Sequence, residues 1–236
     1  MIKDNLILKV RNELKTHADE KTKGSFQRFF KEEVKFHGVK SAVVVKIAKD
    51  NFQEVQKLDK KEVFKLSETL LASGYCEEAW IAANWVHWYN HRQEKDIAIY
   101  EHWINNFIDN WAECDTFCNH TVGAFIEKFP KYLQKLKKWA TSQNLWLRRA
   151  AAVSLIIPAR KGKYLKDIFE IADLLLTDPK DMVQKGYGWM LKEASRKHQK
   201  EVFDYVMKNK KIMPRTALRY AIEKMPQDLR KKAMEK

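Results

Sequence analysis

In Glu78-Ala-Trp80-Ile-Ala-Ala-Asn-Trp85, two tryptophans stand among small apolar residues that favour an α-helix. Similar stretches begin at Trp111, Trp146 and Val183, so the successive spacings are 31, 35 and 37 residues. A loose period in the thirties, made of helix pairs, is typical of α-solenoids. We therefore expect an all-α protein with the fold of a HEAT-like or armadillo-type α-solenoid of antiparallel helix pairs.

The composition also favours a helical fold that forms one continuous domain. The chain has 236 residues, 45% of them hydrophobic, with 7 Gly and 5 Pro. Hairpins need Gly- and Asn-rich turns, so this scarcity argues against an all-β protein. No Ser/Gly-rich linker interrupts the chain, and we expect residues 1–236 to form a single HEAT-like-repeat domain.

The hydrophobic pattern before residue 78 predicts helices separated by loops. The expected elements are a helix over 2–17 with Ile2, Leu6, Val10 and Leu14 on its buried face, a loop over 18–25, a helix that begins over Phe26–Val34 and breaks near Gly38, a helix capped by Ser41, and a helix over Lys60–Ala72 that ends at Gly74. Later in the chain, four prolines are expected at first helical positions: Pro130, Pro179, Pro214 and Pro226. Asp178 would cap the helix after Pro179, whereas Pro158 would end a helix.

Membrane and secretory features are not evident in the sequence. The longest apolar run, Ala150–Pro158, is far too short to span a bilayer, and the first residues lack a signal-peptide pattern. Three cysteines suggest no disulfide framework. We therefore expect a cytoplasmic protein with no membrane partner.

Charge is divided unevenly along the chain. The net charge is +14, yet residues 1–119 carry a net charge of −1 and residues 120–236 carry +15. A single-sign field of this size attracts a polyanion, and nucleic acid is the expected partner, bound by a concave basic face of the solenoid. The alternative is that the lysine-rich helix faces are simply solvated.

A predicted helix over Lys180–Arg196 carries an unusual tryptophan. Its buried stripe is expected to comprise Val183, Tyr187, Met190 and Ala194. Trp189 falls on the other face, with Lys185, Lys192 and Arg196. It could pack against a neighbouring helix, or stack on a sugar or base while the cations hold phosphates. Gly186 and Gly188 indicate that something approaches the backbone closely.

Two arginines begin an otherwise apolar stretch. Arg148 and Arg149 lie in or near the first turn of a helix predicted from Asn144 to Ile157. Cations at that end oppose the helix dipole, so they need an anionic partner. An internal carboxylate and a phosphate of a bound nucleic acid are both open as partners.

The segment Asn110–Asp115 combines an aromatic face with a carboxylate. Trp111 and Asp115 are one helical turn apart and point the same way. Asn110 is expected to cap the helix, with Glu113 completing a capping box, and the dipole would keep Asp115 ionised. Trp111 could equally belong to a core stripe, which would consist of Phe107, Trp111, Cys114 and Cys118.

Metal and cofactor patterns are weak. Cys114-x3-Cys118-x-His120 has no further ligand cluster near it, and core thiols are the expected interpretation. The histidines suggest no catalytic triad, and no glycine-rich loop could cradle phosphates. We expect neither a metal nor a cofactor.

The sequence resembles the DNA alkylation repair proteins of the AlkD family, which are HEAT-like-repeat DNA glycosylases. The resemblance covers most of the chain and rests on residues 29–39, Trp111-x3-Asp115, Asn144-Leu-Trp-Leu-Arg-Arg149-Ala-Ala and Lys185-Gly-Tyr-Gly-Trp189-Met-Leu-Lys-Glu. The last three match the family's active-site segments in order and spacing, whereas the early segment departs somewhat from the family pattern.

The resemblance implies excision of cationic alkylated purines, such as 3-methyladenine and 7-methylguanine, from duplex DNA. It assigns the catalytic carboxylate to Asp115, contacts with the lesion's deoxyribose and backbone to Trp111 and Trp189, and a phosphate contact to Arg149. Arg148 and the basic stripe of Lys185, Lys192 and Arg196 would add DNA contacts. The protein would act as a monomer and leave an abasic site.

Two other functions remain open on the sequence. One is a related, non-catalytic protein that binds branched or distorted DNA with the same scaffold and basic half. The other is a HEAT-type scaffold for an acidic protein. The presence of Asp115 and the two tryptophans favours the enzyme.

Overall fold

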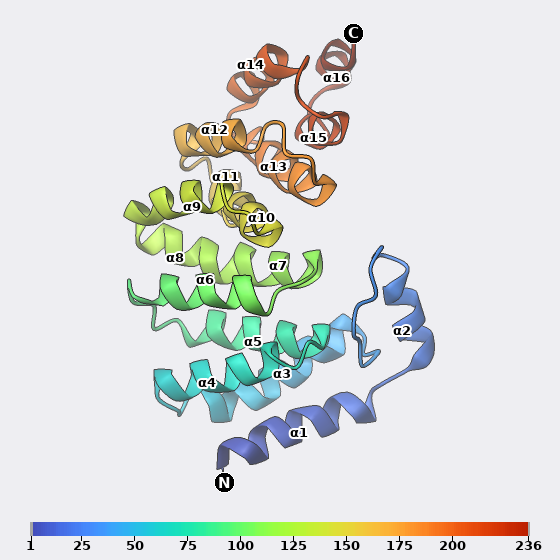
Figure 1. The fold of residues 1–236 in the computed structure, drawn as a ribbon, viewed down its shortest axis with the longest axis vertical. Coiled ribbons are helices and arrows are strands. Elements are labelled where there is room, and N and C mark those ends of the chain that lie inside the picture. The colour runs from blue at the N-terminus through green and yellow to red at the C-terminus, as the bar shows by residue number, and fades with distance from the viewer. Residues whose placement is uncertain (1, 236) are drawn as a thin grey trace. The chain divides into compact units, whose positions relative to one another are not determined.

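The computed structural model describes residues 2–235, with side chains from Asn5 onward. Within this range the chain is all-helical and contains no strand, apart from an isolated bridge between Lys35 and Tyr75 (Figure 1). The predicted all-α class is therefore confirmed. None of the described helices is long and apolar enough to cross a membrane.

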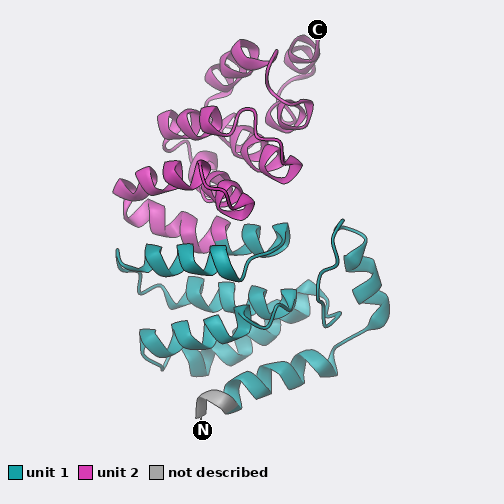
Figure 2. Ribbon diagram, in the orientation of Figure 1, with its two compact units in different colours: residues 1–117 teal, residues 118–236 magenta. Residues whose placement is uncertain are grey.

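The chain divides into two compact units, residues 1–117 and residues 118–236 (Figure 2). This boundary also divides the charge, because unit 1 has a net charge of −1 and unit 2 has +15. The single domain over 1–236 and the concave basic face stay predictions.

Unit 1 is built around α5, which packs against α3, α4 and α7. Its fully buried aromatic side chains include Trp85, Tyr100 and Trp103. The helices are α1 (Ile2–Thr16), α2 (Glu20–Gln27), α3 (Ser41–Val55), α4 (Lys60–Leu71), α5 (Cys76–Tyr89), α6 (Asp96–Asn106) and α7 (Trp111–Phe117).

Unit 2 has two rows of packed helices. One row is formed by α10, α13 and α15, and the other contains α9 and α12, as expected when helix pairs stack. The helices are η1 (Cys118–Val122), α8 (Gly123–Lys128), η2 (Pro130–Tyr132), α9 (Leu133–Ala140), α10 (Leu145–Val153), α11 (Ile156–Arg160), α12 (Leu165–Leu174), α13 (Asp181–Ala194), α14 (Gln199–Asn209), α15 (Arg215–Ala221) and α16 (Gln227–Met234).

Several predicted helices are confirmed. The repeat starts at Trp80, Trp111, Trp146 and Val183 fall in or at the beginning of α5, α7, α10 and α13. In α1, Leu6, Val10 and Leu14 are buried as expected, and the side chain of Ile2 lies outside the described residues.

The region before α3 is where the prediction is wrong. The expected loop over 18–25 is largely α2, because Asp19 caps this helix through Oδ2, which accepts hydrogen bonds from Thr22 N (2.7 Å) and Thr22 Oγ1 (2.6 Å). The helix expected over Phe26–Val34 is absent there, since α2 ends at Gln27. Ser41 is the first residue of α3 and makes no side-chain cap.

Some proline positions also differ from expectation. Pro130 is the first residue of η2, as predicted, but Pro214 and Pro226 are N-caps of α15 and α16. Pro179 lies before α13, which begins at Asp181. Pro158 lies inside α11, where it does not end the helix. Asp178 does not cap α13, whose N-cap is Lys180, because its carboxylate binds an arginine of α10.

Candidate functional site

Helix α7 begins with the cap that the sequence predicts. Asn110 Oδ1 accepts a hydrogen bond from Glu113 N (3.1 Å), and Asn110 O accepts one from Cys114 N (3.1 Å). In a capping box, the Glu113 carboxylate would accept a second hydrogen bond from the backbone N–H of Asn110. Here Glu113 Oε2 instead accepts one from the preceding residue, Asp109 N, at 3.5 Å. The cap fixes the start of the helix that carries Trp111 and Asp115.

Trp111 is half-buried and packs against an aromatic cluster of unit 1. Its indole stacks on Phe30, with ring centroids 5.0 Å apart and an interplanar angle of 15°. The centre of the cluster consists of Val34, Phe36, Cys76 and Ala112, with Phe26 and Trp80 packed around it. Trp111 therefore has a structural contact in addition to any role in binding.

The two carboxylates of α7 lie in different environments. Glu113 is 3% exposed, and burial together with the nearby Asp109 carboxylate raises the pKa of Glu113 to about 8. Asp115 is half-buried and lies one turn after Trp111. Near neutral pH Glu113 is therefore largely protonated, and Asp115 is the acidic side chain of α7 that solvent reaches.

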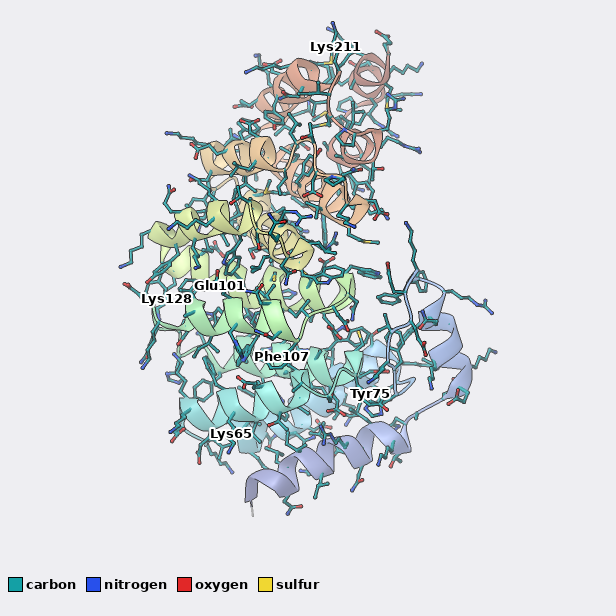
Figure 3. The ribbon with its side chains drawn as sticks, in the orientation of Figure 1. Lys65, Tyr75, Glu101, Phe107, Lys128 and Lys211 are labelled. Carbon is teal, nitrogen blue, oxygen red and sulfur yellow. The ribbon has the colours of Figure 1, made fainter. Side chains whose placement is uncertain are left out.

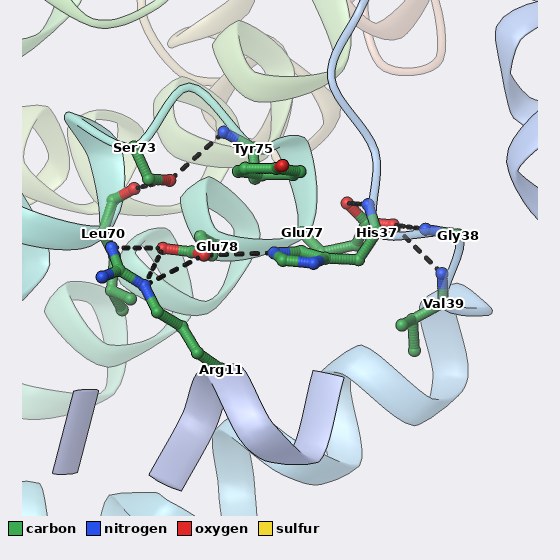
Figure 4. Close-up of polar contacts among 9 residues, drawn as sticks. All are labelled: Arg11, His37, Gly38, Val39, Leu70, Ser73, Tyr75, Glu77 and Glu78. Carbon is green, nitrogen blue, oxygen red and sulfur yellow. Dashed lines mark hydrogen bonds and ion pairs between the residues drawn. The ribbon is translucent and has the colours of Figure 1, made fainter. Parts of the chain in front are cut away.

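The loop that carries Phe30 is held by a buried carboxylate that the sequence does not reveal (Figure 4). Glu77 is fully buried, and its Oε1 accepts hydrogen bonds from Gly38 N (2.8 Å) and Val39 N (3.1 Å). Its Oε2 accepts another from His37 N (3.0 Å). Three backbone donors of the loop are thus satisfied by one side chain of α5.

The neighbouring Glu78 connects the same loop to α1 (Figure 4). It forms an ion pair with Arg11 (3.0 Å) and meets His37 Nε2 at 3.1 Å. Burial alone would raise the pKa of Glu78, but hydrogen bonds from His37 and Arg11 outweigh it and lower the pKa. Tyr75, which precedes α5 (Figure 3), stacks on the His37 ring at 4.1 Å.

In unit 2, Arg148 has an internal partner. Its Nε lies 2.6 Å from Asp178 Oδ2, and its Nη1 donates to Ser142 O (2.9 Å) and Gln143 O (3.0 Å). Of the two partners left open by the sequence, Arg148 therefore has the internal carboxylate. Asp178 also accepts from Lys180 N at 2.9 Å, which orders the entry to α13.

Arg149 lies deeper, at 5% exposure. Its Nη1 donates a hydrogen bond to the carbonyl of Met182, at the first turn of α13. A Cβ added at Gly186 would lie 3.4 Å from Arg149 Cγ, so the glycine leaves room for this side chain. Arg149 thereby joins α10 to α13 within unit 2.

The predicted stripe of α13 is confirmed, since Val183, Tyr187, Met190 and Ala194 are fully buried. Trp189 is half-buried on another side of the helix. The cations predicted beside it have internal carboxylate partners: Lys185 with Asp181 (3.3 Å), Lys192 with Glu223 (2.9 Å) and Arg196 with Glu193 (2.7 Å).

Gly188 explains the close approach expected at the backbone of α13. A Cβ at this position would lie 2.7 Å from Tyr220 Cβ and 2.8 Å from Ala217 O, both on α15. The close neighbour is therefore another helix of unit 2, as it is at Gly186.

Metal ligands are not grouped in the part of the chain that the structure describes. Between residues 2 and 235, no three His, Cys, Asp or Glu side chains are placed to share a metal ion. Cys76, Cys114 and Cys118 are free thiols and buried.

Comparison with known proteins adds a family and a fold. A family model described as DNA alkylation repair enzyme matches residues 10–225. Among solved structures, the chain is similar to a predicted DNA alkylation repair enzyme from Enterococcus faecalis, with a TM-score of 0.80 and 14% identity over 89% of this chain and 98% of that chain. At this identity the similarity shows the fold alone. A search of curated proteins found no match.

Proposed function

Because the chain belongs to the DNA alkylation repair enzyme family, we propose that it is a monofunctional DNA glycosylase. Its substrates would be cationic N3- and N7-alkylated purines in duplex DNA, such as 3-methyladenine and 7-methylguanine, and its product an abasic site. The proposal depends most on one observation, the half-buried Asp115 one turn after Trp111 on α7.

The chemistry needs few protein groups. An N3- or N7-alkylated purine is already positively charged, so it can leave without a general acid. What must be stabilised is the oxocarbenium-like sugar, together with the attacking water. The carboxylate of Asp115 would serve both needs, by its charge and as a base. No lysine is placed as a recognisable Schiff-base nucleophile, so strand cleavage is not part of the proposal.

The remaining residues receive supporting roles in the proposal. Trp111 and Trp189 offer indole faces for a cationic transition state and the adjoining sugars. Arg149 would hold a phosphate, and its bond to the Met182 carbonyl would fix its position. Arg148 would act mainly through its pair with Asp178, by shaping the entry to α13.

The basic stripe of α13 would add weaker DNA contacts. Lys185, Lys192 and Arg196 share their charge with carboxylates, so each must exchange an internal partner for a phosphate. We expect the protein to work as a cytoplasmic monomer.

The test is release of 7-methylguanine from methylated duplex DNA, measured in single-turnover reactions. Asp115→Asn should reduce the rate by about two to three orders of magnitude, because it removes the charge that stabilises the sugar cation. Equal release by wild type and this variant would remove Asp115 from the mechanism.

Glu113→Gln supplies the matched control on the same helix. Because Glu113 is buried and largely protonated, an amide of the same shape should leave the rate within a few-fold of wild type. If wild type bound duplex DNA but released no base, the protein would instead be a non-catalytic DNA-binding member of the family. A protein that ignores DNA at low salt would contradict both functions.

A further inference from the structure

The end of unit 2 contains a groove with an arginine-rich lining. It lies between α15 and α16, and its volume is about 850 Å³. Its cationic residues are Arg215 and Arg219 from α15, and Arg230 and Lys231 from α16. The matched family segment ends at residue 225, so α16 lies beyond it.

Helical spacing directs these cations into the same groove. Arg215 and Arg219 are four residues apart, so they project from one face of α15. On α16, Gln227, Arg230, Lys231 and Met234 follow the i, i+3, i+4, i+7 pattern of a single helix face. The result is a row of positive charges on each side of the groove.

None of the four cations is paired with a carboxylate among the residues that the structure describes. Within residues 2–235, the side chains of Arg219, Arg230 and Lys231 form no ion pair or hydrogen bond, and all three are exposed. Arg215 donates to the carbonyl of Met234 at 3.4 Å, a contact that joins the two helices. This arrangement contrasts with α13, whose Lys185, Lys192 and Arg196 already have carboxylate partners.

One carboxylate, Glu223, lies in the lining, and its charge is compensated. Its Oε2 is 2.9 Å from Lys192 Nζ, and its Oε1 is 3.8 Å from Lys224 Nζ. Lys192 also lies over the Tyr220 ring, 5.6 Å from its centroid. The groove therefore keeps a net positive charge, and its wall is fixed to α13.

The shape of the groove favours a linear polyanion over a compact one. Arg215 and Arg219 are about 6 Å apart along the axis of α15, and two further cations border the groove from α16, so successive negative charges can be contacted in a row. Between them the lining is partly apolar, with Ile222, Tyr220 and Met234, which suits sugar faces between phosphates. A nucleic-acid backbone has this alternation of charge and apolar surface.

We infer that the α15–α16 groove binds the phosphodiester backbone of duplex DNA outside the reacting nucleotide. This inference rests on the proposed function, in that DNA is the partner, but it requires no base excision. Arg219 and Arg230 are the principal phosphate contacts, and Lys231 is a secondary one.

The experiment measures the affinity for unmodified duplex DNA by fluorescence anisotropy, from low to moderate KCl concentration. Each phosphate contact contributes about 0.9 to the slope of log K against log salt. The variant Arg219→Gln/Arg230→Gln should therefore lower the slope by about 1.8, with roughly a ten-fold or greater loss of affinity at low salt.

A matched variant separates the groove from the general field of unit 2. Lys138→Gln/Lys208→Gln also removes two charges, from exposed lysines of α9 and α14 that do not line the groove. We expect this variant to change the slope much less. Arg215 stays intact in both proteins, and thermal unfolding checks that both are folded.

The outcomes distinguish this inference from the proposed function. In single-turnover reactions, the groove variant should need a higher protein concentration than wild type to reach its half-maximal rate of 7-methylguanine release. A lower slope for the groove variant would support DNA binding in the groove even if wild type released no base. If the slope of the groove variant were unchanged, or if the lysine variant lowered the slope equally, the inference would be overturned whether or not base is released. Groove-dependent binding of polyglutamate, with unaltered DNA binding, would also overturn it, because the occupant would then be an acidic protein.

Discussion

Unit 1 and unit 2 differ in how they use charged side chains. In unit 1, the buried Glu77 and Glu78 hold a loop and a helix against α5, and the net charge is −1. In unit 2, Arg148 and Asp178 form a similar internal pair, but the net charge is +15. Cations such as Arg219 and Arg230 are exposed and form no ion pair with any described residue.

The difference separates two uses of electrostatics. Buried charges are costly unless they are paired, so removing one partner should lower the free energy of unfolding by a similar amount in either unit. Exposed surplus cations contribute little to stability but set the long-range attraction of a polyanion. Stability measurements should therefore give similar results for the two units, while the salt-dependent part of DNA affinity should depend mainly on unit 2.

The largest effect is expected in unit 1. Glu77→Ala should lower the free energy of unfolding by roughly 3–6 kcal/mol, because three backbone N–H groups, two of them buried, lose their acceptor. Urea unfolding measures this loss. The exposed Glu33→Ala is the control and should change stability by less than about 0.5 kcal/mol. Similar losses for both variants would show that Glu77 does not hold the loop.

The counterpart in unit 2 should be nearly as large. Arg148→Ala leaves Asp178 buried without its guanidinium, and about 3–5 kcal/mol of stability should be lost. Arg196→Ala is the matched control, because Glu193 keeps Arg160 as a partner at 2.7 Å. A loss for Arg196→Ala as large as that for Arg148→Ala would contradict the view that a buried carboxylate destabilises the fold only when it is left without an arginine.

A pH-dependent effect of intermediate size is expected at Glu113. Its pKa is raised from 4.5 to about 8 on folding, so the folded protein binds this proton more tightly than the unfolded chain. The free energy of unfolding therefore falls between these pH values as pH rises, and Glu113→Gln should remove that fall. The variant should gain on the order of 2–4 kcal/mol over wild type at pH 9, compared with pH 5.

The measurement is the melting temperature of both proteins across this pH range. Glu32→Gln, at an exposed position, should follow wild type at every pH. A variant that is less stable than wild type at pH 9 would mean that Glu113 is ionised and favourably placed.

The smallest stability effects are expected when one glycine from each unit is replaced by alanine. Gly188→Ala should cost about 1–3 kcal/mol, because its Cβ would meet Tyr220 Cβ at 2.7 Å. Gly24→Ala, in α2 with nothing within 4 Å of the added atom, should stabilise by about 0.5–1 kcal/mol. Opposite signs in chemical denaturation would support the close α13–α15 packing, and equal signs would contradict it.

Local patterns in the sequence were sufficient for much of the helical framework. The stripe of Val183, Tyr187, Met190 and Ala194 is a signal carried within one helix, and it predicts the buried face of α13 correctly. The Asn110 cap is similarly local. Helix α2 was missed although Asp19 precedes Thr22 by three residues, because Gly24 and the polar composition favoured a loop.

Contacts distant in sequence account for what could not be predicted. Glu77 reaches backbone atoms 38 to 40 residues away, and Arg148 reaches Asp178 across 30 residues. Neither pairing follows from helical periodicity. The functional roles of Asp115, Trp111, Trp189 and Arg149 stay proposals, because they concern a partner rather than the fold of the chain.

The absent side chain at Gly188 has a mechanical consequence. With Tyr220 Cβ and Ala217 O close to the backbone of α13, α15 cannot slide or tilt without displacing the helix that carries Trp189. The joint between these two helices is therefore stiff. If a bent duplex bound at the far end of unit 2 displaced α15, α13 would therefore move with it, because no flexible hinge between the two helices would absorb the displacement.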